Sequence, residues 1–378
     1  MIVSFDGKRA VSNTTGLGNY SRRVISTLAQ KFSNDEYVIL APKMKHTSEL
    51  DELLKMNNVH IEISPHPILG HIWRFGRGIL KSAAHHHTDV FHGLSAELPL
   101  GVKKSGMASV VTIHDMIYYH FPKYYSFIDR SIYYRKALYA CQASDRIVTV
   151  SEFTKKDVVN ILGIDPKKID VVYPCVGEEY LSDVSFACVK ELRESLKLPE
   201  RYILAVGRLV YHKNFILAIE SLSLLEDKNV VLVMVGKENS YWRNEIYPIV
   251  KKYGLADRVR LIPWVDSRLM PALYAEAQAV VFPSFCEGFG LPVLEAHHCG
   301  TPVLCARGSA LDEVGGDATY FFDPHDANGL ATGLDNILAD NNLAQAMSDR
   351  GRINASRFAP DKMAERLHAI YEQVLRRD

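Results

Sequence analysis

Residues 279 to 307 read AVVFPSFCEGFGLPVLEAHHCGTPVLCAR, and this stretch predicts a strand, a helix and a second strand in immediate succession. The apolar run Ala279 to Phe282 is too short for a helix and is followed by proline, which is typical of a buried parallel strand. After a turn rich in small residues, Leu291 to Cys299 has the composition of a helix with a proline in its first turn. A second apolar run, Pro302 to Cys305, completes the unit. Ligands of such parallel units bind beyond the carboxyl ends of the strands, where this turn lies.

Two glutamates flank the turn. Glu287 lies within it, and Glu295 follows about one turn into the helix, so the two carboxylates can reach different hydroxyl groups of one elongated ligand. Between them, the backbone amides of Phe289, Gly290 and Leu291 belong to a helix N-terminus, where unpaired N–H groups and the helix dipole favour phosphate. A sugar nucleotide combines hexose hydroxyls, a pyrophosphate and ribose hydroxyls. Acidic residues at a helix start also occur for purely structural reasons, and the pair alone leaves both interpretations open.

The full string E-G-F-G-L-P-V-L-E-A is more specific, and it resembles the signature of the retaining glycosyltransferases of family 4, which have the GT-B fold. The match continues with few breaks from Pro283 to Val303. The resemblance implies that Glu287 contacts the donor hexose, that Glu295 contacts the ribose, and that the intervening amides bind the phosphates and the sugar.

Size and composition indicate a globular protein of several domains. The 378 residues predict two to three domains of about 150 residues each. The sequence has no run of 18 apolar residues, and its amino terminus has no signal-peptide pattern. The six cysteines show no metal-ligand pairing, as expected for reduced thiols. We therefore expect a cytoplasmic protein.

Charge is distributed unevenly although the formal net charge is zero. Residues 1–175 contain 22 Lys and Arg against 16 Asp and Glu, and the remainder contains 22 against 28. A basic half predicts contact with an anionic acceptor or an anionic membrane surface, although ordinary solvated faces explain the excess equally well. Nucleic acid is not expected as a partner, because no basic stripe interleaved with aromatic residues occurs.

Short apolar runs alternate with helical patterns through the first 175 residues, which predicts a doubly wound parallel sheet. The runs are Ile2 to Phe5, Tyr37 to Ala41, Val59 to Ile63, Val90 to His92, Val110 to Ile113, Ile147 to Val150 and Val171 to Tyr173.

The loop Asn13-Thr14-Thr15-Gly16-Leu17-Gly18 follows the first of these runs and opens a helix. Glycines at such a place let backbone amides approach a phosphate, but Gly-x-Gly by itself is also typical of a plain flexible loop. The resemblance implies that Gly16 and Gly18 belong to a loop that closes over the donor pyrophosphate.

Two further segments of the first half mix apolar and basic residues. Residues 66–81 could lean on a bilayer as an interfacial helix, but a helix that covers the sheet with a basic outer face is the favoured interpretation. The segment Tyr118 to Ala140 is rich in Tyr and Phe, most of which are expected to pack in the core. The resemblance implies that it helps to shape the acceptor site.

His114 ends the fifth apolar run and is the strongest site candidate of the first half. A histidine at a strand end is often a hydrogen-bonded structural residue, and the neighbouring Asp115 could fix its tautomer and raise its basicity. The resemblance implies that His114 lies near the transferred sugar and the acceptor. Whether it orients a hydroxyl group or transfers a proton stays open.

The second half begins with a strand that ends at Gly207, followed by Arg208, Lys213 and Asn214, with Asn214 expected to cap an apolar helix. Two cations near a helix N-terminus predict an anion site, although a surface loop would also carry them. The G-R-x-x-x-x-K-N block resembles the one in family 4, which implies that Arg208 and Lys213 bind the donor diphosphate without a metal. The resemblance also places Val265 at the nucleotide base.

The sequence therefore predicts an α/β protein of GT-B type, with two Rossmann-like doubly wound domains facing across a cleft. Residues 1–175 form the acceptor-side domain, residues 176–358 the nucleotide-sugar donor domain, and residues 359–378 a helix that crosses back to the first domain. Within family 4 the resemblance is greatest to bacterial mannosyltransferases that build surface polysaccharides, which implies transfer of a hexose, with mannose favoured, from GDP-mannose or another nucleoside diphosphate hexose to a glycan or lipid-linked acceptor hydroxyl. No further cofactor is expected. A sugar-nucleotide epimerase and a non-catalytic sugar-nucleotide binding module are the alternatives.

Overall fold

The computed structural model describes residues 1–13, 15–45, 47–65 and 69–376. Thr14 of the glycine-bearing loop and residues 66–68 of the apolar, basic segment lie outside the described residues. The chain folds into two compact units, which are Met1–Cys175 with Ala359–Asp378 and Val176–Phe358.

Seven parallel strands form the sheet in the described part of the first unit, in the order β3-β2-β1-β4-β5-β6-β7. The strands are β1 (Ile2–Asp6), β2 (Glu36–Ala41), β3 (Val59–Ile63), β4 (Val90–Gly93), β5 (Ala108–Ile113), β6 (Arg146–Thr149) and β7 (Ile169–Val171). Chain order reverses between β1 and β4, and ligands of doubly wound sheets bind at the carboxyl ends of the strands at such a point.

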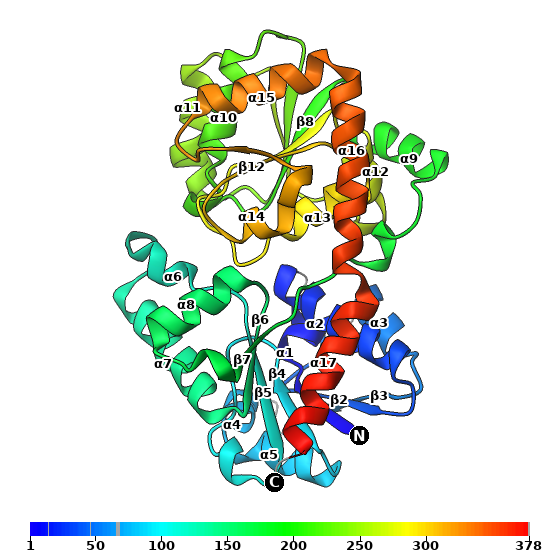
Figure 1. Ribbon diagram of the computed structural model, residues 1–378, viewed down its shortest axis with the longest axis vertical. Coiled ribbons are helices and arrows are strands. Elements are labelled where there is room, and N and C mark those ends of the chain that lie inside the picture. The colour runs from blue at the N-terminus through cyan, green and yellow to red at the C-terminus, as the bar shows by residue number, and fades with distance from the viewer. Residues whose placement is uncertain (14, 46, 66–68, 377–378) are drawn as a thin grey trace. The chain divides into compact units, whose positions relative to one another are not determined.

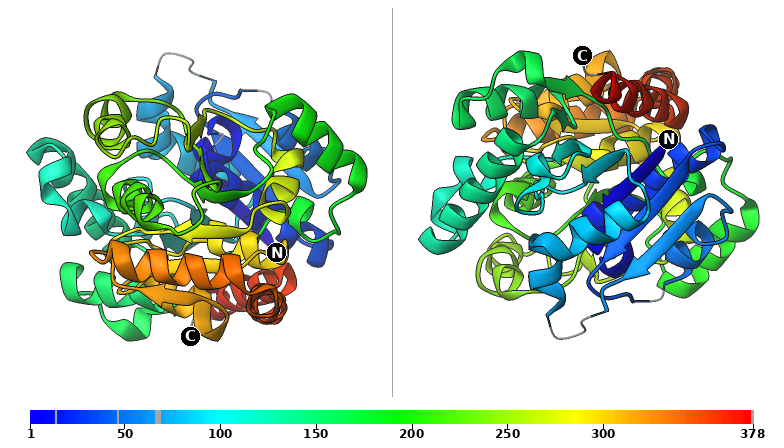
Figure 2. Two further views of the ribbon diagram at one scale, coloured as in Figure 1. Left: turned by 90° about the horizontal axis from the view of Figure 1, so that it is seen from above. Right: turned by 90° about the horizontal axis from the view of Figure 1, so that it is seen from below.

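Helices cover both faces of this sheet (Figures 1 and 2). They are α1 (Lys8–Ser12), α2 (Gly16–Lys31), α3 (Ser48–Leu53), α4 (Gly70–Phe75), α5 (Arg77–His85), α6 (Ile117–His120), α7 (Phe127–Ala143), α8 (Glu152–Leu162) and α17 (Pro360–Leu375). The last of these, α17, lies against α2, β4 and β5 and buries the apolar face that its sequence predicts, including Leu367 and Tyr371. The expected return of the final helix to the first domain is confirmed.

The second unit has the same architecture, with the strand order β10-β9-β8-β11-β12-β13 in its parallel sheet. The strands are β8 (Tyr202–Val206), β9 (Val231–Val235), β10 (Val259–Ile262), β11 (Ala279–Phe282), β12 (Val303–Ala306) and β13 (Tyr320–Phe322). The helices are α9 (Phe186–Leu196), α10 (Phe215–Leu224), α11 (Tyr247–Lys252), α12 (Met270–Ala275), α13 (Leu291–His298), α14 (Ala310–Gly315), α15 (Ala327–Ala339) and α16 (Asn341–Ala355). Order reverses between β8 and β11, so the loops after these two strands occupy the ligand-binding point of the sheet.

The two doubly wound sheets predicted from the apolar runs are confirmed, with two differences at the sheet edges. β7 covers Ile169–Val171, two residues earlier than predicted, because Ile169 is the residue that pairs with Ile147 of β6. β13 is a strand for which the sequence analysis identified no apolar run, and its residues Tyr320 to Phe322 pair with β12. Both are three-residue edge strands, too short for alternation to reveal.

The apolar, basic segment forms two short helices, α4 and α5, which meet at Gly76. α5 buries Ile79, Leu80 and Ala83, so the favoured interpretation of a helix that covers the sheet is confirmed for this part of the segment. Among the described residues, no helix combines the length and the apolar character needed to cross a membrane.

Candidate active site

The loops that follow β8 and β11 are joined at the ligand-binding point of the second unit. The Phe285 N–H donates a hydrogen bond of 2.8 Å to the carbonyl oxygen of His212, which lies in the short helix η5 (Tyr211–Lys213). The rings of Tyr211 and Phe285 stack with centroids 5.3 Å apart. These contacts bring the G-R-x-x-x-x-K-N block and the loop of Glu287 together.

An ion pair between Lys213 and Glu287 lies within this junction. The Lys213 Nζ is 2.7 Å from Glu287 Oε1, and the two side chains are only 16% and 10% exposed. The ammonium also lies 4.8 Å above the ring of Phe282 at the end of β11. Oε1 is buried, and among the described residues it has this ion pair but no hydrogen bond of good geometry.

Asn214 holds the loops together rather than capping the helix that follows it. Its backbone is in the left-handed region, with φ of 52°, and its side chain makes no cap hydrogen bond to α10. The side-chain amide instead donates to the carbonyl oxygens of Pro283, at 3.1 Å, and Pro324, at 2.8 Å. The predicted capping role is therefore wrong: a capping residue has an extended backbone and accepts through its side-chain oxygen, whereas the Asn214 backbone is left-handed and its amide NH2 group is fixed by two tertiary acceptors.

Arg208 is exposed and precedes the same short helix. Arg208 acts electrostatically on His212. Burial lowers the pKa of His212, the nearby cations Lys213 and Arg208 lower it further, Glu287 opposes them, and the resulting pKa is about 4. His212 is therefore neutral at pH 7, and the positive charge of this loop belongs to Arg208 and Lys213.

The N-terminus of α13 has the form that the sequence predicts. Gly290 adopts φ of 109°, and a side chain there would lie 2.6 Å from Leu311, so the close approach to α14 requires glycine. Pro292 occupies the first turn. A helix start leaves its first N–H groups, including that of Leu291, without intrahelical acceptors, and the neighbouring Phe289 is buried against Phe358.

Glu295 lies one turn further along α13 and has a partner that the sequence does not indicate. The buried hydroxyl of Tyr274, on α12, donates a hydrogen bond of 2.8 Å to Glu295 Oε2. Burial and the Glu295 charge raise the pKa of Tyr274 well above its usual value, so the phenol stays a donor. Tyr274 thereby fixes the orientation of the carboxylate.

Val265 lies apart from these residues along the sheet. It belongs to the loop after β10, and β9 separates β10 from β8. Its side chain is buried, whereas the adjacent Trp264 is 72% exposed. The structure thus groups Lys213, Glu287 and the start of α13 at the switch point and leaves Val265 nearer the sheet edge.

The candidate residues of the first unit gather around the start of α2. A side chain at Gly18 would lie 1.8 Å from the carbonyl oxygen of Asn13, whereas one at Gly16 would meet no described atom within 4 Å. Tyr20, one turn into the same helix, presents its ring to His114 edge-on at 4.6 Å. The glycine-bearing loop and His114, predicted separately, therefore belong to one region.

The tautomer of His114 follows from its hydrogen bond. Nε2 lies 2.8 Å from the carbonyl oxygen of Leu94, which can only accept, so Nε2 carries the proton and Nδ1 is left as an acceptor. Burial and the charge of Arg9 lower the pKa of His114 to about 4, against the opposing effect of the Leu94 hydrogen bond. The expected rise in basicity through Asp115 is wrong, because desolvation dominates.

A buried hydrogen-bonded chain behind His114 was missed by the sequence analysis. His92 contacts the Tyr371 hydroxyl of α17 at 2.6 Å and the Thr112 hydroxyl at 2.9 Å. Thr112 in turn lies 3.5 Å from the Tyr20 hydroxyl, beside His114. The members come from α2, β4, β5 and α17, so no local spacing could reveal them.

Comparison with known families identifies both halves of the chain. Residues 14–180 match the model described as Glycosyltransferase Family 4, and residues 189–354 match the model described as Glycosyl transferases group 1. The chain belongs to the GT-B glycosyltransferases. The transferase is 25% identical over 360 residues to O-antigen chain mannosyltransferase B of Escherichia coli, covering 91% of this chain and 92% of that protein.

Other relatives agree with this assignment. The serotype-specific mannosyltransferase WbdA of Escherichia coli is 27% identical over 233 residues, which are 60% of this chain and 28% of that longer protein. The structure of Anabaena HepE in complex with UDP-glucose superposes with a TM-score of 0.77 at 17% sequence identity, over 98% of this chain and 99% of that one. The transferase is accordingly a hexosyltransferase that uses a nucleotide sugar.

Proposed function

We propose that the enzyme transfers mannose from GDP-mannose to a hydroxyl group of a glycan or lipid-linked acceptor, with retention of anomeric configuration. The observation that carries the proposal is the Lys213–Glu287 pair, which puts a hydroxyl acceptor beside a diphosphate-binding cation. The names of the relatives, an O-antigen chain mannosyltransferase and a serotype-specific mannosyltransferase, support mannose. Another nucleoside diphosphate hexose is the alternative donor.

Stabilisation of the departing diphosphate supplies the main catalytic effect in this proposal. Arg208, Lys213 and the amides of Phe289, Gly290 and Leu291 bind the phosphate oxygens, so the negative charge that develops on the leaving group meets fixed cations and dipoles. The bond between the anomeric carbon and the phosphate oxygen breaks as the acceptor oxygen attacks on the same face. The acceptor proton goes to the leaving phosphate oxygen.

The two glutamates bind the donor in this scheme and form no covalent bond to it. Glu287 accepts a hydrogen bond from a hexose hydroxyl through its carboxylate, and Glu295, held by Tyr274, accepts from the ribose. The loop of Val265 contacts the base through backbone groups. A trapped glycosyl adduct on Glu287 would overturn this assignment.

The first unit contributes the remaining site residues. Gly16 and Gly18 let the loop before α2 approach the donor pyrophosphate, and His114 accepts a hydrogen bond from a sugar hydroxyl at Nδ1. Its low pKa and its Leu94 partner favour orientation over proton transfer. We also propose that the enzyme works in the cytoplasm, with peripheral contact to the inner face of an anionic membrane.

A thermal-shift screen with GDP-, UDP- and ADP-sugars tests the donor. A ligand that binds only the folded state at about 100 times its Kd stabilises it by about 2.7 kcal/mol, so the true donor raises the melting temperature most. The variant Lys213→Ala should lose this shift. Release of free nucleoside diphosphate only with acceptor present, and an NMR spectrum showing the donor's anomeric configuration in the product, would support the reaction. A donor that rearranges without release of nucleotide would contradict it.

A further inference from the structure

The first part of α7 has no fully buried side chain. Of its 17 residues, Phe127 to Lys136 are all at least partly exposed, and the first buried residue is Ala137. Phe127 is 78% exposed and Ile128 69%. Tyr134 packs partly against the core of the unit, so the half-helix is attached on that side, while large apolar side chains elsewhere on it stay exposed.

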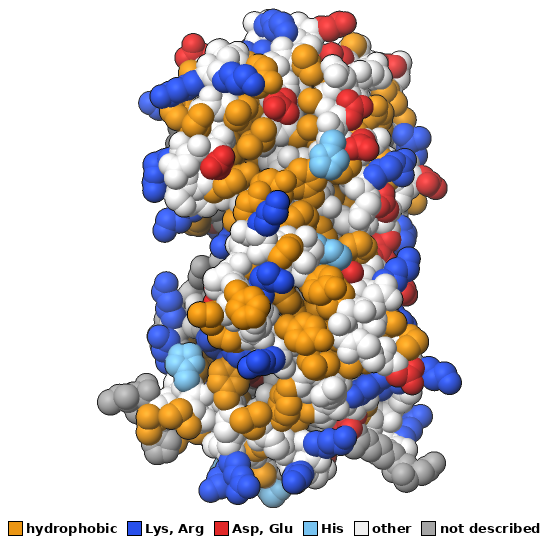
Figure 3. Space-filling model, turned by 90° about the vertical axis from the view of Figure 1, so that its left-hand side faces the viewer, with side chains coloured by type: hydrophobic (Ala, Val, Ile, Leu, Met, Phe, Trp, Pro, Cys, Tyr) orange, Lys and Arg blue, Asp and Glu red, His pale blue; other side chains and the backbone are white. Residues whose placement is uncertain are grey.

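Large exposed apolar side chains cluster on this helix and the segment before it, which we call the α6–α7 face. Its members are Tyr119, Tyr124, Phe127, Ile128, Ile132 and Tyr133, all between 43% and 78% exposed. Figure 3 shows hydrophobic and basic side chains interspersed on this side of the first unit. The exposed apolar side chains are thus concentrated within one short segment of the chain, between Tyr119 and Tyr133.

Basic residues accompany this apolar surface. Between residues 118 and 136 the cations are Lys123, Arg130, Arg135 and Lys136, and Asp129 is the single acidic residue. Lys136 forms an ion pair with Glu97, and Asp129 bonds to the helix cap Ser126. Three cations thus remain beside the exposed rings, and the occupant of the face must be both apolar and anionic.

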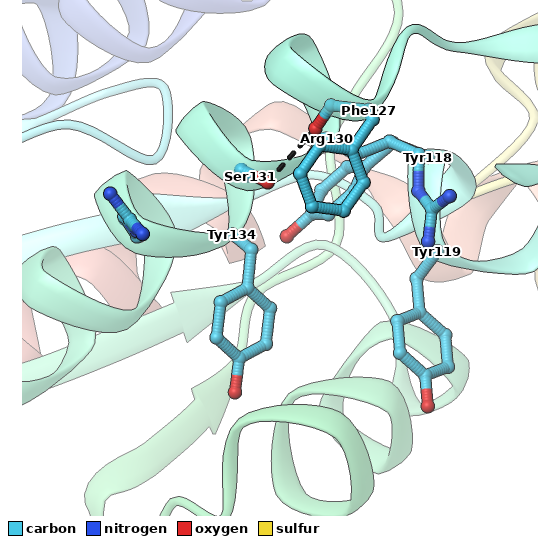
Figure 4. A pocket seen from close by; sticks show the side chains of 7 residues that line it. Tyr118, Tyr119, Phe127, Arg130, Ser131 and Tyr134 are labelled. Carbon is cyan, nitrogen blue, oxygen red and sulfur yellow. Dashed lines mark hydrogen bonds between the residues drawn. The ribbon is translucent and has the colours of Figure 1, made fainter.

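A cavity opens within the same face, between α6 and α7 (Figure 4). It has a volume of about 210 Å³ and is lined by the rings of Tyr118, Tyr119, Phe127 and Tyr134 together with Arg130 and Arg135. The rings offer an apolar wall and the guanidinium groups offer donors for phosphate. An anionic lipid combines an acyl chain with a phosphate headgroup and so presents both features.

We propose that the α6–α7 face docks the enzyme onto an anionic lipid bilayer, with Phe127 and Ile128 entering the headgroup region and Lys123, Arg130 and Arg135 facing lipid phosphates. Tyrosine and basic residues around an apolar core are the composition of interfacial segments. The inference specifies the peripheral membrane contact of the proposed function, but it does not depend on the identity of the donor.

Vesicle co-sedimentation tests the proposal, with phosphatidylcholine vesicles compared with vesicles that also contain phosphatidylglycerol. The wild type should bind the anionic vesicles, and binding should weaken with added salt. Phe127→Ala with Ile128→Ala should reduce vesicle affinity about tenfold or more, since each exposed apolar side chain contributes by its buried area. Arg130→Gln with Arg135→Gln should reduce it about fivefold for each charge removed.

Matched controls come from the second unit. Phe186→Ala with Ile353→Ala removes side chains that are 83% and 72% exposed, and Lys251→Gln with Lys252→Gln removes two adjacent exposed cations. Both controls should bind vesicles like the wild type. An inactive Lys213→Ala variant should also bind vesicles normally, which separates failure of the membrane proposal from failure of the proposed reaction.

Three results would overturn the inference. The wild type could fail to bind anionic vesicles, the α6–α7 variants could bind them as well as the controls do, or sedimentation velocity could show that the face joins two copies of the chain without vesicle binding. Arg130 is partly exposed, and the other side chains substituted in the α6–α7 variants and in the second-unit controls are exposed, so unchanged melting temperatures should accompany these variants.

Discussion

The ammonium of Lys213 and the carboxylate of Glu287 lie 2.7 Å apart, on two loops that are distant in sequence and adjacent in the sheet. Both side chains are largely removed from water, so their attraction is only weakly screened. In the proposed function, a donor diphosphate at this place would compete with Glu287 for the same ammonium. The pair would then couple recognition of the sugar to recognition of the phosphates.

The variant Glu287→Gln should separate these two effects. Removing the carboxylate releases Lys213 for the phosphates and removes a like charge, so affinity for free nucleoside diphosphate should rise about fivefold. Sugar transfer should fall by about a hundredfold or more, because the hexose loses a charged hydrogen-bond acceptor. Calorimetric titration with the nucleoside diphosphate and steady-state kinetics with the donor sugar measure the two changes.

The exposed Glu245 of the same unit provides the control for this charge change. Glu245→Gln should alter neither quantity. Weaker binding of free nucleoside diphosphate by Glu287→Gln would show that the carboxylate supports the diphosphate site rather than competing with it.

Asn214 should prove to be a positioning residue for the cationic loop. Asn214→Gly keeps access to the left-handed backbone but loses the hydrogen bonds to Pro283 and Pro324, at a cost of about 1 kcal/mol each. Asn214→Ala should lose about 1 kcal/mol more, because alanine is strained at φ of 52°. Urea denaturation measures both.

The effect of the two Asn214 variants on enzyme kinetics distinguishes a positioning role from a purely stabilising one. Both variants should raise the KM for the donor more than they lower kcat, since Lys213 is no longer held beside the loop of Glu287. Equal stability of the glycine and alanine variants would argue against backbone strain, and an unchanged KM in both would remove the positioning role.

The stretch from Ala279 to Arg307 was sufficient to predict β11, α13 and β12, because strand, helix start and strand are each specified by neighbouring residues. The cap of α8 is local in the same way, since Ser151 accepts from the Thr154 N–H three residues further along the chain. Contacts between elements that are distant in sequence could not be predicted from local sequence patterns. Tyr274 donates a hydrogen bond to Glu295 from another helix. The Asn214 side chain does not cap α10 and donates instead to two carbonyl groups that are distant in sequence. A local sequence pattern indicates only hydrogen-bond partners that are near in sequence. The tertiary structure determines which partner a side chain contacts.

His114 should show no titration of its own in the neutral range. With a pKa of about 4, its imidazole is neutral throughout pH 5.5 to 8, and its Nδ1 accepts a hydrogen bond over that whole range. His114→Ala should lower kcat/KM by about 10- to 100-fold by the same factor at every pH, consistent with one lost hydrogen bond. The pH profiles of kcat/KM for wild type and variant measure this. An ascending limb near pH 6.5 that disappears in the variant would instead identify His114 as a general base.

His297, which is buried on the helix that carries Glu295, should make the second unit sensitive to acid. Its Nδ1 accepts from the Asn354 amide, and its Nε2 lies 3.2 Å from the Thr319 hydroxyl, so a second ring proton would face an N–H donor. Burial lowers the pKa of His297 to about 4, and the neighbouring His298 has a smaller effect in the same direction. Because the folded pKa lies below the unfolded value of 6.5, the unfolded state binds the proton first, and stability present above pH 6.5 is lost as the pH falls towards 4. One such proton changes the unfolding free energy by about 1.4 kcal/mol per pH unit within this window.

His297→Gln should reduce the pH dependence of the unfolding free energy by that amount, whereas the exposed His325→Gln should leave it unchanged. Pulse-labelling hydrogen exchange across a urea series at several pH values, followed on peptides of α13, measures the slopes directly, and equal slopes for His297→Gln and wild type would mean that acid acts on the second unit through another group.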